Sequence, residues 1–186
     1  MKTKLLTTLL TATFLFFSLN TKAADITSSS AEYKNDRFVI KVVGVVDASP
    51  ERVFALLTDY NNITKISPKI VESKIIKTDG DAIIVKTVAD GCVWFFCKKV
   101  INVQTTTSIL KKNIQSITIP SQSNLKFGKM VWNINKVKSG TEVEYYAEIE
   151  PDFFVPPLIG AYFIKSSMLE EAKDFVDSVE KLAGQD

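Results

Sequence analysis

The chain has 186 residues, with 23 lysines and arginines against 21 aspartates and glutamates, a formal net charge of +2. It contains no histidine and two cysteines, Cys92 and Cys97. The lack of histidine excludes Ser-His-Asp and Cys-His catalysis and removes the commonest zinc ligand. We therefore predict no catalytic residue, no metal site and no cofactor.

The first 23 residues have the pattern of a secretory signal peptide. Lys2 and Lys4 form a basic start, residues 5–19 are apolar apart from threonines and a serine, and Thr21-Lys22-Ala23 offers small residues at the cleavage positions. The apolar run is shorter than the ~20 residues of a membrane-spanning helix, which argues against an anchor. We expect cleavage near Ala23 and an exported protein, periplasmic or secreted.

Cleavage at this point changes the charge of the chain. The removed segment holds three lysines and no acidic residue, so 20 basic and 21 acidic residues remain, a net charge of −1. This balance does not favour a nucleic-acid partner, and none is expected. About 160 residues are left, the size of a single domain. We divide them into a flexible, serine-rich segment at 24–32 and one folded domain at 33–184.

The folded domain is predicted to begin with a strand and two short helices. Residues 33–47 are dominated by β-branched side chains, which favour a strand. Ser49 is a good N-cap and Pro50 suits the first helical position of a helix that ends near Asp59. Residues 63–66 are expected to form a second, shorter helix.

From residue 70 onward the chain predicts consecutive antiparallel strands. Turn signals at Asp79–Asp81 and Ser139–Gly140 separate neighbouring segments. In the last strand, apolar residues alternate with four glutamates, which predicts a buried face and a solvated face on which the glutamates have no catalytic role. The predicted strands are 71–78, 82–89, 98–107, 113–120, 126–138 and 141–150.

A long amphipathic helix is predicted at the C-terminus. After Pro157, apolar residues recur at helical spacing as far as Ala183, and acids and lysines occupy the other face. The helix would have roughly 25 residues and a length of about 37 Å, with Gly184 as a C-terminal glycine stop. Its apolar stripe and the apolar face of the strands must cover each other. We therefore predict an α+β fold, a curved antiparallel sheet of about seven strands wrapped around this helix.

Two segments, Ser49–Tyr60 and Ile66–Ser73, and the proline-rich approach to the last helix at 151–158 together resemble the START-like superfamily, the polyketide cyclase/dehydrase and coenzyme Q-binding type of SRPBCC helix-grip protein. The resemblance covers the mature chain in element order. It implies a helix-grip fold and a ligand-binding cavity between the sheet and the last helix. Members bind lipids, quinones, sterols or polyketides, and a minority are cyclases or hydrolases, so the fold leaves function open.

The segment from Cys92 to Cys97 is predicted to form a hairpin. In a continuous strand the two cysteines would lie roughly 16 Å apart, whereas a hairpin with a four-residue tip brings them together. The Asp90-Gly91 pair and the superfamily pattern both favour the hairpin, and export favours a disulfide between the cysteines. The tip residues either touch a membrane surface or the cavity mouth, or fold inward as core. They are Val93, Trp94, Phe95 and Phe96.

The implied cavity would be lined by apolar residues of the late strands and the last helix. The candidate ligand-binding residues are Trp132, Tyr145, Ala147, Tyr162, Phe163, Met168 and Leu169. For each of them, ordinary core packing is the alternative, since an apolar stripe is usually core. The apolar loop at 153–157 is predicted either to touch a membrane or to seal the core.

These features predict a monomeric, exported carrier or binding protein for a hydrophobic small molecule, such as a lipid, an isoprenoid or a polyketide-like compound. The alternative is a cyclase or hydrolase that acts on an aromatic or lipid substrate in the same cavity. An inward-facing carboxylate–tyrosine pair would favour that enzyme, and a wholly apolar cavity would exclude it. A third alternative is a protein-interaction module whose cavity has collapsed.

Overall fold

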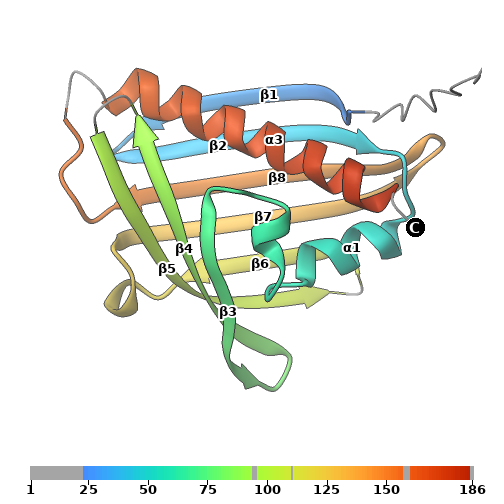
Figure 1. The fold of residues 1–186 in the computed structure, drawn as a ribbon, viewed down its shortest axis with the longest axis horizontal. Coiled ribbons are helices and arrows are strands. Elements are labelled where there is room, and N and C mark those ends of the chain that lie inside the picture. Colours follow the sequence, from blue (N-terminus) through green and yellow to red (C-terminus); the bar gives the residue numbers. More distant parts are fainter. Residues whose placement is uncertain (1–22, 94–95, 110, 157–159, 185–186) are drawn as a thin grey trace, which may run out of the picture.

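Eight antiparallel strands form one sheet in the computed structural model, which describes residues 23–93, 96–109, 111–156 and 160–184. The strand order is β1-β2-β8-β7-β6-β5-β4-β3, so the β2–β8 pairing joins the two ends of the chain (Figure 1). The strands are β1 Asp25–Lys34, β2 Arg37–Val46, β3 Ile70–Asp79, β4 Ala82–Val93, β5 Phe96–Ile109, β6 Asn113–Thr118, β7 Leu125–Val137 and β8 Gly140–Pro151.

The sheet therefore has eight strands where the sequence predicts about seven. The additional strand is β1, which occupies most of the segment 24–32 that was predicted to be flexible. Its pairing with β2 runs from Asp25 opposite Val45 to Lys34 opposite Arg37. An edge strand pairs on one side and mostly faces solvent, so its serine-rich sequence lacks the apolar alternation that marks an inner strand.

Two short helices follow β2, whereas the sequence predicts them after the first strand, because the additional edge strand β1 precedes them. Helix α1 (Pro50–Thr58) begins where the Ser49 side chain accepts a hydrogen bond from the backbone N–H of Arg52 at 3.2 Å. The second is a single 3-10 turn, η1 (Ile63–Lys65). Another 3-10 turn, η2 (Pro120–Gln122), joins β6 to β7.

The predicted long helix ends at Ala183, as expected, but its beginning and its C-terminal cap differ from the prediction. It consists of a π-helical turn, η3 (Gly160–Ile164), followed by α3 (Lys165–Ala183). The backbone N–H of Gly184 donates to the Glu180 carbonyl at 3.2 Å. The φ of Gly184 is −88°, so α3 ends without the left-handed residue of a glycine stop.

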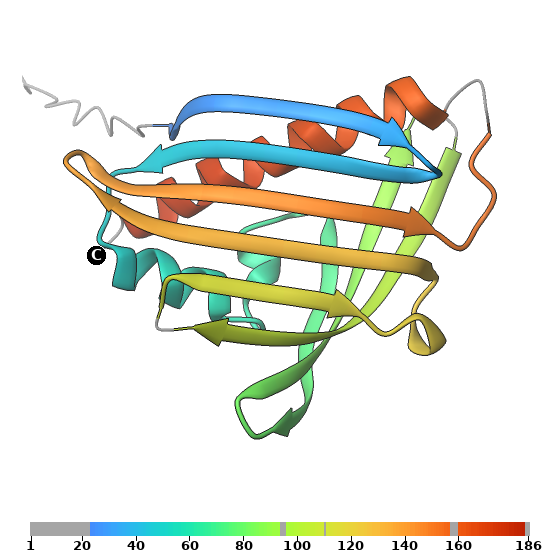
Figure 2. The same cartoon turned by 180° about the vertical axis from the view of Figure 1, so that it is seen from behind.

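The sheet curves around α3. The helix lies over β1, β2 and β8, while β3, β4 and β5 run across that direction and close the other side (Figures 1 and 2). Gly44 on β2 permits a close approach, because a β-carbon there would lie 3.2 Å from Cγ1 of Val176. This is the helix-grip arrangement that the sequence predicts.

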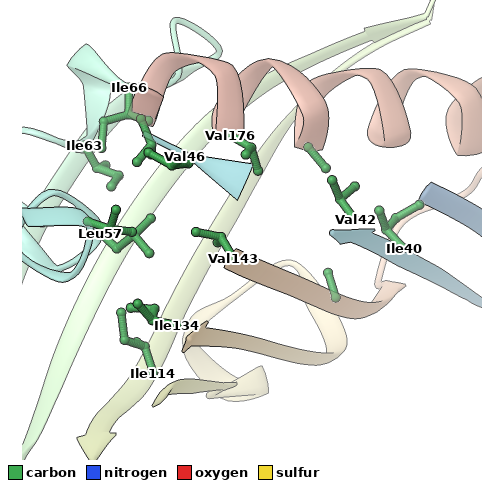
Figure 3. Packing of buried hydrophobic residues seen from close by; sticks show 14 residues of the cluster. Ile40, Val42, Val46, Leu57, Ile63, Ile66, Ile114, Ile134, Val143 and Val176 are labelled. Carbon is green, nitrogen blue, oxygen red and sulfur yellow. The ribbon is translucent and has the colours of Figure 1, made fainter. Parts of the chain in front are cut away.

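The main core lies where the second half of α3 meets the sheet and α1. Figure 3 shows Val46 of β2, Val143 of β8 and Val176 of α3 in one cluster, with Leu57 of α1 beside them. Polar contacts anchor the same end of the helix. The buried carboxylate of Glu180 accepts the backbone N–H of Asp47 at 2.6 Å.

The hairpin at the two cysteines is confirmed. Strands β4 and β5 pair through Cys92 opposite Cys97, and these residues form a disulfide. The ladder continues to Val93 opposite Phe96, so these two belong to the strands and not to a four-residue tip. Trp94 and Phe95, and the side chains of Val93 and Phe96, lie outside the described structure, so their contact with a membrane stays a prediction.

Candidate functional site

A cavity of about 320 Å³ lies between the concave face of the sheet and the first half of α3. Its walls are mostly apolar. Strands β2 to β8 all contribute lining residues, and α3 contributes one face of its first turns. The main apolar wall residues are Ile40, Ile114, Met130, Trp132, Tyr145, Ala147, Ile164, Met168 and Phe175.

One face of the last helix forms a wall of this cavity. Ile164, Met168 and Phe175 recur at helical spacing and line it, together with Ser167 and Glu171. Further along the helix, the same stripe reaches Val176 and Val179, which are fully buried in the core. The stripe thus changes from cavity wall to packed core within a few turns.

Aromatic rings form the central part of the cavity wall. Trp132 on β7 and Tyr145 on β8 are paired residues, with ring centroids 4.2 Å apart. Phe175 of α3 lies 5.2 Å from Trp132, measured between ring centroids. This cluster links the sheet to the helix and offers flat apolar surfaces to a ligand.

Polar side chains line another part of the cavity, on β5 and β6. Asn102, Gln104 and Ser116 contribute to the wall, and all three are buried. Ser116 bonds the hydroxyl of Thr106 at 2.8 Å, and Thr118 donates to Asn102 at 2.8 Å. The cavity is therefore not wholly apolar, and the polar groups on β5 and β6 can fix the orientation of a bound molecule.

Two tyrosines of the cavity are held in their neutral form. Burial raises the pKa of Tyr60 to about 12. Burial also raises the pKa of Tyr145, and the nearby charge of Glu171 adds to this effect. Both hydroxyl groups therefore remain protonated at neutral pH and are able to donate a hydrogen bond.

Glu171 and Tyr145 both line the cavity, and the charge of Glu171 contributes to the raised pKa of Tyr145, so we treat them as the candidate carboxylate–tyrosine pair. The Glu171 carboxylate also lies 3.6 Å from the ammonium group of Lys69. The Glu171–Tyr145 pair is the feature that would favour an enzyme. The ion pair between Glu171 and Lys69 is an ordinary structural contact at the cavity rim.

The solvent-exposed lining residues gather at the disulfide end of the cavity, and we call them the cavity mouth. They are Asp90, Gly91, Cys92 and Lys98. In Figures 1 and 2 this end of the β4–β5 hairpin lies beside the start of α3. Phe153 and Val155, from the apolar loop after β8, also line the cavity. The hairpin and this loop therefore frame the opening.

Residues 37–183 match a protein family described as polyketide cyclase / dehydrase and lipid transport. The chain belongs to this family. Its fold is the START-like helix-grip fold, as the sequence resemblance implies. No curated protein sequence matches the chain significantly.

Solved structures with the same fold have different stated roles. A STAR-related lipid transfer protein from Xanthomonas axonopodis has a TM-score of 0.68 at 11% identity, covering 88% of this chain and 100% of that one. The Zhui aromatase/cyclase from a Streptomyces species has a TM-score of 0.66 at 10% identity, with coverages of 79% and 93%. A START superfamily protein from Mycobacterium smegmatis has a TM-score of 0.64 at 13% identity, with coverages of 79% and 97%. At these identities the likeness establishes the fold.

In this member of the family, the structure separates the predicted ligand-binding residues into two groups. Trp132, Tyr145, Ala147 and Met168 line the cavity. Leu169 packs against the core cluster, and Tyr162 is 69% exposed, with its ring at right angles to that of Phe163. Tyr162, Phe163 and Leu169 are not among the described lining residues. Whether any of the seven binds a ligand stays a prediction.

Sequence reasoning missed the polar part of the wall and Tyr60. The strand 98–107 carries Asn102 and Gln104 on one face, in phase with Val100, while Ile101 and Val103 lie on the other. Because both faces carry apolar residues, alternation cannot show which one is inside. The signal that was available is two amide side chains two residues apart in a strand otherwise rich in valine and isoleucine.

Proposed function

We propose that this protein is an exported carrier or binding protein for a hydrophobic small molecule of the lipid, isoprenoid or polyketide-like kind. The observation that carries the proposal is the cavity of about 320 Å³, whose walls are mostly apolar. Such a space is the usual form of a small-molecule site. The family description, which includes lipid transport, agrees with this function.

Export is supported by two features of the chain. The first 23 residues have the signal-peptide pattern, although residues 1–22 lie outside the described structure. The Cys92–Cys97 disulfide is consistent with an extracellular location, where oxidising conditions preserve such bonds. Within the described residues, no helix has the length and apolar character needed to cross a membrane. A monomer that takes up its ligand at a membrane surface, with the hairpin tip as the contact, fits this role.

A second candidate function is a cyclase or hydrolase, and the Glu171–Tyr145 pair favours it. A carboxylate that accepts a proton and a neutral tyrosine that donates one are the groups that general acid–base catalysis requires. In such an enzyme Glu171 would be the base and Tyr145 the acid, acting on an aromatic or lipid substrate between the sheet and α3.

One experiment separates the two functions. The protein is purified from the export compartment of its own host, analysed by native mass spectrometry, and its bound compounds are extracted. A reproducible bound lipid that is released chemically unchanged after incubation supports the carrier. A compound that is converted by the wild-type protein but not by Glu171→Gln supports the enzyme. A protein that carries no compound, and takes up none from its host's lipid extract, contradicts both.

A further inference from the structure

A buried chain of hydrogen bonds crosses β5 and β6 at the cavity wall. The hydroxyl of Thr118 donates to Oδ1 of Asn102 at 2.8 Å, and Nδ2 of Asn102 donates to Oε1 of Gln104 at 2.8 Å. The three side chains are 6%, 7% and 7% exposed. Thr118 donates to Asn102 and Asn102 donates to Gln104, so all hydrogen bonds of this network run in one direction. The last group of the network is the amide nitrogen of Gln104.

The end of this chain faces the cavity without a partner. Gln104 lines the cavity, and its Oε1 is already occupied by Asn102. Among the described residues, none accepts a hydrogen bond from its Nε2 group. Because Gln104 lines the cavity, this amide donor can be satisfied by water or by an acceptor that comes from outside the chain.

Tyr60 supplies a second donor to the same cavity. Its side chain is 9% exposed, it lines the cavity, and its hydroxyl has no hydrogen-bond partner among the described residues. The Tyr60 carbonyl accepts a hydrogen bond from Ser73 at 2.5 Å. Ser73 pairs with Thr87, which pairs with Asn102. The backbone of Tyr60 is therefore attached to Ser73, which lies in the same row of paired strand residues as Asn102.

We propose that Tyr60 and Gln104 form a polar subsite, which binds an uncharged oxygen acceptor such as a carbonyl on one end of the hydrophobic ligand. This inference rests on the proposed function and names the ligand more closely. The apolar body of the ligand then extends along Trp132 and Met168 toward the cavity mouth. Each of the two residues offers one donor for which no acceptor is found among the described residues.

The charge distribution explains why the acceptor is uncharged. The cationic residues that line the described cavity are Lys69 and Lys98. Lys98 belongs to the mouth, and Lys69 lies at the same end, because its carbonyl accepts the backbone N–H of Asp90 at 2.8 Å. A carboxylate at Tyr60 and Gln104 would thus be buried away from both cations, which is costly. A carbonyl, ester or hydroxyl oxygen bears no such cost.

The test compares two probes that differ in one oxygen, decylbenzene and decanophenone. Their affinities are measured by displacement of a fluorescent apolar dye from the full mature chain. The wild-type protein is expected to bind decanophenone roughly fivefold to tenfold more tightly than decylbenzene, the effect of one or two satisfied donors. Tyr60→Phe and Gln104→Met should each reduce this preference to below about threefold, while the affinity for decylbenzene stays unchanged within about twofold.

Matched controls are available on the outer face of the sheet. Tyr146→Phe and Gln115→Met change the same residue types outside the cavity lining, and each should keep the full preference for the ketone. Tyr60→Phe removes a hydroxyl that bonds to no described residue, so this variant is expected to fold even if Gln104→Met does not.

The outcomes separate the subsite from the function. Equal affinity of the wild-type protein for both probes, or a ketone preference that survives in Tyr60→Phe, overturns the subsite and leaves the hydrophobic carrier intact. Failure of both probes to displace the dye, or of the dye to bind, contradicts the carrier itself. A ketone preference that is lost in Tyr60→Phe and kept in the controls supports the proposal.

Discussion

The two halves of α3 use the same apolar stripe in different ways. In the second half, Val176 and Val179 are 1% and 2% exposed and pack against the sheet, where Gly44 permits the close approach. In the first half, Ser167 and Met168 face a cavity of about 320 Å³. Residues that stabilise the fold and residues that line the cavity therefore lie on successive turns of one helix. Substitutions in the second half should mainly change stability, and substitutions in the first half should mainly change ligand binding.

The largest expected effect belongs to the packed half. Val176→Ala removes two buried methyl groups and leaves a void that the surrounding core fills incompletely. We expect the free energy of unfolding to fall by about 2 kcal/mol. Urea denaturation followed by circular dichroism measures this change. Ligand affinity should be unchanged, and a variant that instead loses binding at full stability would break the comparison.

A smaller effect is expected where β1 joins the packed half. The backbone nitrogen of Ala24 donates to Oδ1 of Asp177 at 2.9 Å. If the signal peptide is cleaved after Ala23, this nitrogen becomes the α-amino group and the hydrogen bond becomes an ion pair. Asp177→Asn should then lower the free energy of unfolding by about 1 kcal/mol.

The control for this contact is Asp174→Asn, a change at an exposed position of the same helix. Thermal unfolding of the mature chain is compared with that of a chain extended by residues before Ala24. A loss of equal size in both chains, or for both substitutions, would show that the α-amino group contributes nothing specific.

In the first half of α3, which lines the cavity, a substitution should change ligand binding more than it changes stability. Met168→Ala shortens a side chain that already faces the cavity, so the free energy of unfolding is expected to fall by less than about 1 kcal/mol. The dissociation constant of a bound apolar dye should rise several-fold, because the wall moves away from it. Equilibrium unfolding and dye titration on the same sample check both values. A stability loss as large as that of Val176→Ala would mean that this half is packed as well.

The smallest effect belongs to the outer face of the sheet. Hydrogen bonds from Arg37 and then from Tyr146 hold the pKa of Glu148 below its ordinary value. The stabilisation is therefore present above the unfolded pKa of a glutamate, about 4.3, and is lost as the pH falls through the lower folded value. The difference in melting temperature between wild type and Arg37→Met should shrink from pH 7 to pH 3, whereas Lys126→Met at an exposed position should show no such trend.

The fold could be predicted to a large extent because its signals are local. Ser49 and Pro50 mark the start of α1, and the Asp90-Gly91 pair, together with the superfamily pattern, favours the hairpin that brings Cys92 and Cys97 together. The strand β1 was not predicted, because an edge strand needs little apolar surface and its sequence therefore lacks apolar alternation.

The site was less predictable, since the sequence does not show which part of an apolar helical stripe packs in the core and which part lines a cavity. Val176 and Met168 belong to one helical pattern, but the first is core and the second lines the cavity. Tyr162 extends the same pattern and is 69% exposed. Gln104 and Tyr60 are polar residues whose inward position depends on how strands and α1 meet, which periodicity does not encode.

The most direct test of a hydrophobic ligand site between the sheet and α3 is to fill it. Ser167→Trp places a large side chain on the lining face of α3, and Ser166→Trp places the same side chain on the neighbouring exposed position. Titration with a fluorescent apolar dye should give one bound molecule per chain for the wild type and for Ser166→Trp, and none for Ser167→Trp at an unchanged melting temperature. Equal binding by all three proteins, or binding by none, would contradict the account.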